Sequence, residues 1–280
     1  MGLLLALAIL CLLQRRAAVS GALVALGVVC IKFLPLLYFP AFFRAARSRL
    51  RWLLGAAGVL AAVYGGAAVL HLPFLAPLTR EGDLKTASNL TYVIESVFNV
   101  NIPSRVGDVV LLLILGTIFL LIARALRECS HASRMRVLIF GLAALTLALL
   151  VFSKKSWPPY LMFTLFPISL LMTEGGHRRL RLGAFALFSM VAVVVQSFWA
   201  TVFSQPLAPG FHLLLLERRP AAFLLLALQV LIVAGYLWLL IEAVRRITGS
   251  ERLSASLSGS LQEIPYATQP RTVQDNATRF

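Results

Sequence analysis

Charged residues are scarce in this sequence, and acidic residues are the scarcest. Only 13% of the 280 residues are charged, whereas a soluble globular protein carries about 25%. The chain has 11 Asp and Glu against 26 Lys and Arg, and 60% of its residues are hydrophobic. Its mean hydropathy is +0.88. This balance excludes a soluble globular domain and indicates a polytopic membrane protein.

Residues that bind metals or form disulfides are also few. The three cysteines are scattered along the chain at Cys11, Cys30 and Cys129. The four histidines are equally scattered, at His71, His131, His177 and His212. None of these positions has the spacing of a metal site or of a disulfide framework, so we expect no metal. The sequence also lacks the nucleotide-binding and nucleophile motifs of soluble enzymes, which disfavours a catalytic domain of that kind.

Long apolar runs dominate what remains. They lie at 2–13, 17–43, 52–78, 108–126, 135–153, 158–173, 182–203 and 221–243. No period-2 alternation of a barrel strand is visible in them, and only helices can satisfy the backbone of such runs in lipid. We therefore predict an all-α bundle of about eight transmembrane helices over residues 1–248, with Pro35 and Pro40 kinking the second one.

The first run is short. Twelve residues give about 18 Å of helix, against about 30 Å of hydrocarbon. Either this run is a re-entrant or interfacial piece, or it is the end of a longer helix whose preceding residues are missing from the sequence. We favour the second interpretation.

Basic residues indicate an orientation. Fourteen of them fall at 44–51, 124–136, 178–181 and 245–252, and nine fall in the intervening connections. The positive-inside rule then places both chain ends in the cytoplasm, and we expect a bacterial plasma membrane. Residues 249–280 are rich in Ser, Thr and Gln and predict a disordered cytoplasmic tail. The net charge of +15 does not indicate nucleic-acid binding, because the arginines stand in short loops that flank the membrane.

One buried lysine is a candidate functional residue. Lys32 stands about 11 residues, or about 16 Å of helix, before the cytoplasmic edge of its run, which is farther than a lysine can comfortably snorkel. An ammonium group inside the membrane is costly and is functional by default. The alternatives are a contact with the carbonyl freed by Pro35, or a water-filled cleft that holds no ligand.

The outer connection at 79–107 is the longest of the chain. Its centre, residues 90–98, is amphipathic and predicts a short interfacial helix that roofs a cavity, although a plain solvated loop is an equal alternative. We place Arg80, Asn89 and His71 at the vestibule of that cavity.

A second polar cluster interrupts the apolar sequence at 153–160. Lys154 and Lys155 supply two ammonium groups at the membrane boundary, and Trp157 and Tyr160 supply aromatic faces beside two prolines. Such a group suits a phosphate or diphosphate headgroup, with the aromatic rings against a sugar or an isoprenoid chain. The alternative is a membrane anchor, for which Lys-Lys beside Trp is a common pattern.

Two of these stretches carry a resemblance. Lys32-Phe33-Leu34-Pro35, followed by an arginine-rich loop, and Lys155-Ser156-Trp157-Pro158-Pro159-Tyr160 resemble the K-x-x-P helix and the K-x-x-P-x-Y helix start of the GT-C membrane glycosyltransferases. The chain is most similar to glycosyltransferase family 87, the polyprenol-phosphate-sugar-dependent mannosyltransferase-like group, over about residues 15–200.

The resemblance implies an inverting transfer of a hexose such as mannose. The donor is a polyprenyl-phosphate-linked sugar, the acceptor is a glycan or glycolipid, and Lys154, Lys155 and Tyr160 match positions expected to meet the lipid phosphate. The family's catalytic acid lies in its first outer loop, whereas residues 14–19 contain none. Glu81, Asp83 and Glu95 remain as outer acids, so the catalytic residue stays unknown.

Two other classes of function remain open. A flippase for polyprenyl-linked saccharides, or another lipid or solute transporter, also needs buried basic residues but no catalytic acid. Inverted repeats and paired broken helices would favour it, and neither is visible. A non-catalytic membrane scaffold would use its lysines as anchors only.

Overall fold

The computed structural model describes residues 2–30, 34–72, 89–128, 131–154, 180–181, 183–191, 194 and 208–262. Every regular element in these ranges is helical, so the all-α prediction is confirmed. The elements are α1 Gly2–Leu13, α2 Ala17–Cys30, the 3-10 helix η1 Leu34–Tyr38, α3 Phe39–Ala45, α4 Arg49–Val69, α6 Leu90–Phe98, α7 Ser104–Glu128, α8 His131–Phe152, α11 Ala208–Leu216 and α12 Pro220–Gln262.

Four of the described helices are long and apolar enough to cross a membrane. They occupy Arg49–Val69, Ser104–Arg127, Ser133–Phe152 and Pro220–Gly249. Two shorter apolar helices, Leu3–Leu13 and Ala17–Cys30, accompany them. This supports a membrane-embedded protein. The number eight stays a prediction, because the run at 158–173 and part of the run at 182–203 lie outside the described residues.

The predicted helix over 17–43 is not continuous. Helix α2 ends at Cys30, a 3-10 helix that contains Pro35 follows, and α3 begins at Phe39 with Pro40 in its first turn. Proline lacks the N–H of an interior helical bond, so it is tolerated in the first turn of a helix, where that donor has no partner. The sequence predicts one kinked helix here, whereas the described residues form α2, η1 and α3 as separate elements, with each proline in the first turn of its element.

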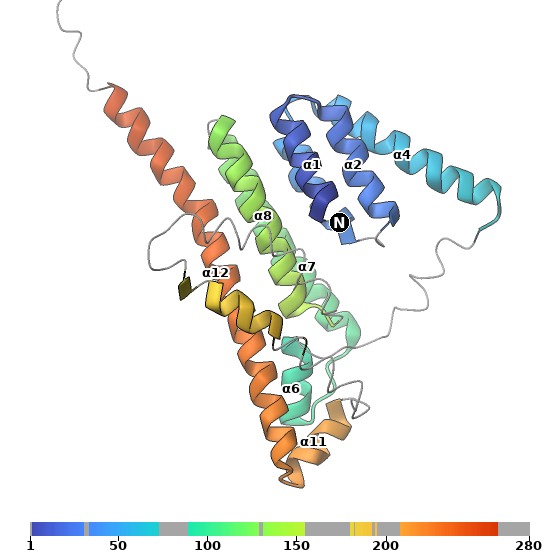
Figure 1. Cartoon of the computed structure of the whole chain (residues 1–280), viewed down its shortest axis with the longest axis vertical. Coiled ribbons are helices and arrows are strands. Elements are labelled where there is room, and N and C mark those ends of the chain that lie inside the picture. The colour runs from blue at the N-terminus through green and yellow to red at the C-terminus, as the bar shows by residue number, and fades with distance from the viewer. Residues whose placement is uncertain are drawn as a thin grey trace, which may run out of the picture.

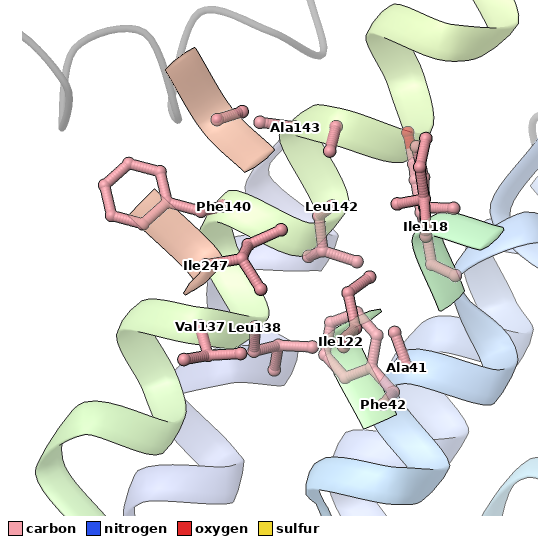
Figure 2. Packing of buried hydrophobic residues seen from close by; sticks show 14 of the residues in the cluster. Ala41, Phe42, Ile118, Ile122, Val137, Leu138, Phe140, Leu142, Ala143 and Ile247 are labelled. Atoms are coloured by element: carbon pink, nitrogen blue, oxygen red, sulfur yellow. The ribbon is translucent and has the colours of Figure 1, made fainter. Parts of the chain in front are cut away.

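The core lies where α3, α7, α8 and α12 meet. Figure 2 shows Phe42 of α3, Ile122 of α7 and Leu138 of α8 gathered in one place, and all three side chains are fully buried. Helix α8 is the central element, with 78% of its spanning window buried, against 11% for α4. In Figure 1, α1, α2 and α4 form a group on one side of the bundle, and α6 and α11 lie at its lower end.

Helices α2 and α4 touch through their backbones. A Cβ atom added at Gly21 would collide with the carbonyl oxygen of Trp52, and one added at Gly55 would collide with the carbonyl oxygen of Ala18. Glycine permits this approach because it has no side chain, as at the small-residue interfaces of membrane helices. The α2–α4 contact therefore depends on these two glycines.

The last helix is longer than the sequence predicts. Helix α12 continues to Gln262, so residues 249–262 are helical where a disordered tail was expected after 248. Leucine recurs there at every fourth position, 253, 257 and 261, which suits the spacing of successive helical turns. The rest of the predicted tail, 263–280, lies outside the described residues.

Candidate functional site

Helix α6 closes one end of the bundle, here called the α6 end. Its N-cap is Asn89, whose Oδ1 accepts a hydrogen bond of 2.8 Å from the backbone N–H of Tyr92. An Asn side chain in this position satisfies a donor that the first helical turn leaves unpaired. Asn99 ends the helix in the left-handed conformation. The predicted short helix at 90–98 is therefore confirmed, and its place on a membrane surface stays a prediction.

An ion pair lies at the same end. The Nζ of Lys154 is 2.8 Å from Oδ2 of Asp108, with the lysine side chain 12% exposed and the aspartate side chain 48% exposed. The pair forms because α7 and α8 pack against each other with the start of α7 beside the end of α8. Asp108 stands in the first turns of α7 and Lys154 just after the end of α8, so the two side chains meet.

Asn89 joins this pair to α6. Its Nδ2 lies 3.5 Å from the backbone oxygen of Lys154, at the long limit of a hydrogen bond. Asn89 is 1% exposed, so protein contacts rather than water fix the orientation of its amide. Asn89 and Lys154 are candidates for two different sites in the sequence, and the structure places them in contact.

Other polar groups fasten α6 to its surroundings. The Oε1 of Glu95 accepts a hydrogen bond of 2.8 Å from the backbone N–H of Ile102, and Glu95 is 4% exposed. The Nδ1 of His212 on α11 lies 2.9 Å from the backbone oxygen of Ser96. Glu95, one of the outer acids in the sequence, thus binds the backbone of the segment between α6 and α7.

His71 is not part of this group. It is exposed just beyond α4, in the left-handed conformation, and its Nδ1 lies 3.1 Å from the oxygen of Ala68 on its own helix. Figure 1 shows the end of α4 well away from α6, so the structure does not join His71 to Asn89 in one vestibule. The remaining candidates, Lys155, Trp157, Tyr160, Lys32 and Arg80, lie outside the described residues.

Asp108 is the residue that sequence reasoning missed. The outer acids in the sequence are Glu81, Asp83 and Glu95, whereas Asp108 begins the apolar run at 108–126. A signal was available, because two consecutive spans with a short connection are antiparallel neighbours. Residues at their distant ends, such as Asp108 and Lys154, must then lie close together.

Metal-ligating groups do not gather in the part of the chain that the structure describes, where no three His, Cys, Asp or Glu side chains could hold an ion together. Cys11 and Cys30 are free thiols. The polar chemistry of the α6 end is therefore that of an ammonium, a carboxylate and an amide.

Comparison with known proteins finds no match among family models, curated proteins or solved structures.

The cap of α6 makes a testable contribution to stability. We expect Asn89→Ala to lower the free energy of unfolding by about 1–2 kcal/mol, because the N–H of Tyr92 loses a buried acceptor. Ser48, the N-cap of α4, makes no side-chain cap hydrogen bond, so Ser48→Ala is the matched control and should change little. Thermal unfolding in detergent measures both variants, and equal effects would contradict the capping role.

Tyr92 should make the α6 end sensitive to high pH. Burial raises the pKa of Tyr92 to about 12 from its ordinary 10.0. The folded state thus keeps the phenol proton to a higher pH than the unfolded state. Stability is retained below about pH 10 and falls as the pH rises toward 12, by about 1 kcal/mol at about pH 11.

The variant Tyr92→Phe isolates this effect from the other tyrosines. We expect its loss of stability between about pH 9 and about pH 11 to be smaller than that of the unmodified protein by about 1 kcal/mol. Thermal unfolding at the two pH values measures the difference. Identical losses would show that the Tyr92 hydroxyl keeps an ordinary pKa in the folded protein.

Proposed function

We propose that this chain is an integral-membrane glycosyltransferase, or part of one, that moves a hexose such as mannose from a polyprenyl-phosphate donor to a glycan or glycolipid acceptor. The observation that supports this most is the ion pair at the α6 end, where Lys154 stands beside a carboxylate that the sequence did not lead us to expect. A phosphate-binding cation and a base are the two groups that such a transfer needs.

The lysine suits the leaving phosphate. An ammonium group has three donors, and Lys154 directs one of them to Asp108. The other two remain for a phosphate that gains charge as the bond to the sugar breaks. In the proposal Lys155, Trp157 and Tyr160, the next residues along the chain, complete the contact with the phosphate and the isoprenoid.

Asp108 is our candidate for the general base. Its carboxylate is about half exposed, and Lys154 is its sole partner among the described residues. It takes the proton of the acceptor hydroxyl while that oxygen bonds to the anomeric carbon of the sugar. The bond from that carbon to the phosphate oxygen breaks, and its electron pair leaves with the polyprenyl phosphate. Asp108 lies at the start of α7, whereas the family resemblance implies a base in the first outer loop.

We also propose an orientation in the membrane. Helix α8 separates Arg134 from Lys154 by 20 residues, or about 30 Å of helix, so the arginine-rich connections and the α6 end lie at opposite ends. We place the α6 end outside a bacterial plasma membrane and both chain ends in the cytoplasm, as the arginine count favours.

The experiment uses the full chain in lipid vesicles with a polyprenyl-phosphate hexose labelled in the sugar. We expect labelled glycan or glycolipid and free polyprenyl phosphate as products. The double variant Lys154→Ala with Lys155→Ala should lower the rate at least about 100-fold while expression is kept. Movement of intact donor across the membrane without cleavage would instead identify a transporter. Unchanged transfer in the double variant would return the lysines to the role of anchors.

A further inference from the structure

A groove with a wholly apolar lining lies between α3 and the start of α4. Its walls are Phe39, Pro40, Phe43, Trp52 and Leu53, and it is a shallow, open depression with a volume of about 240 Å³. The rings of Phe39 and Trp52 pack edge to face with their centroids 4.8 Å apart. This contact fixes two of the side chains that line the groove. This volume is below the roughly 300–1,000 Å³ of a small-molecule pocket and suits a segment of an acyl chain.

Two arginines flank the residues of this groove along the chain. Arg44 follows Phe43 directly at the end of α3, and Arg49 opens α4 one turn before Trp52 and Leu53. Arg127 and Arg134 approach from α7 and α8, and burial together with the charges of Arg49, Arg127 and Arg134 lowers the pKa of Arg44. Arg44 is thus exposed to the positive charge of three other guanidinium groups.

No described acid offsets this repulsion. None of the four arginines pairs with a carboxylate among the side chains that the structure describes. The Nε of Arg134 is buried and has no hydrogen-bond partner, and its Nη2 reaches only the oxygen of Leu126 at 3.4 Å. A buried donor without a partner is costly. This cluster therefore favours an anion.

We propose that this corner binds an anionic phospholipid, with an acyl chain in the α3–α4 groove and the phosphate among Arg44, Arg49 and Arg134. Basic pockets between membrane helices bind lipid headgroups in this way. The exposure of α4 supports a lipid over a soluble anion, since only Trp52 and Ala56 of this helix are buried. The groove opens on a helix face that is otherwise free to contact lipid.

The test measures lipid binding to the purified full chain in detergent by native mass spectrometry. Phosphatidylglycerol and phosphatidylcholine with the same acyl chains are the two probes. We expect the double variant Arg44→Gln with Arg49→Gln to bind phosphatidylglycerol at least about tenfold more weakly, because hydrogen bonds between charged groups are lost. Binding of phosphatidylcholine should be unchanged.

The control removes the same charge elsewhere. Arg105 and Arg218 are exposed at the α6 end, and Arg105→Gln with Arg218→Gln should leave phosphatidylglycerol binding within about twofold of the unmodified protein. If both double variants weaken binding equally, or if the unmodified protein binds the two lipids equally, the site does not exist. Arg49 is exposed, so Arg49→Gln alone gives the same test should the double variant not fold. The outcome is independent of sugar transfer.

Discussion

Replacing Gly21 by leucine is expected to separate α2 from α4 and to lower the melting temperature of the protein strongly. The new side chain would collide with the carbonyl oxygen of Trp52, which belongs to the backbone and cannot turn aside. Overpacking a core usually costs about 1–3 kcal/mol, and a backbone collision belongs at or above the upper value. We expect a loss of at least about 3 kcal/mol, or roughly 6–12 °C.

Gly58 on α4 provides the control for this experiment. No atom lies within 4 Å of the Cβ that would be added there, so Gly58→Leu should stay within about 0.5 kcal/mol of the unmodified protein. Thermal unfolding of the purified chains in one detergent gives the comparison. Equal melting temperatures for the two variants would show that α2 and α4 do not meet at Gly21.

The second large effect concerns catalysis. We expect Asp108→Asn to lower the rate of sugar transfer by about 10²–10⁴, because an amide has nearly the shape of the carboxylate but cannot take the proton of the acceptor hydroxyl. The KM for the polyprenyl-phosphate donor should change much less. Initial rates at varied donor concentration separate the two quantities.

Loss of stability cannot account for a drop of this size. The side chain of Asp108 is 48% exposed, and an ion pair with one partner at the surface contributes about 0–1 kcal/mol. The matched control is Glu217→Gln, which removes the 2.8 Å pair between Glu217 and Arg219 in the turn before α12. Transfer by this variant should stay within about twofold of the unmodified protein. A comparable drop in both variants would contradict the role of Asp108 as a base.

The sequence predicted helices well where one local rule decides them. Helix α6 matches the predicted 90–98 because its amphipathic pattern, the cap at Asn89 and the left-handed exit at Asn99 agree. The region around Pro35 and Pro40 is harder to predict, because a proline either kinks a helix or ends it. Helix α3 packs against α7 and α8, and the sequence does not show this packing. Phe42 of α3 is fully buried in that core.

Only one of the two charged residues of the candidate site could be identified from the sequence. Lys154 was identified because an ammonium group at a membrane boundary stands out in apolar sequence. Asp108 was not, because its importance comes from a partner 46 residues away and a single carboxylate at a helix start looks like an ordinary boundary residue. The close approach at Gly21 was equally hidden, since the sequence does not specify which helix faces α2.

The role of Lys154 and Asp108 is tested most directly by exchanging them, in the variant Asp108→Lys with Lys154→Asp. This exchange keeps an ion pair between α7 and α8 but moves the ammonium and the carboxylate to each other's positions. We predict that the exchanged protein melts within about 2 °C of the unmodified protein while its transfer rate remains at least about 100-fold lower. Recovery of both stability and transfer would contradict the account, because it would reduce the pair to a structural link.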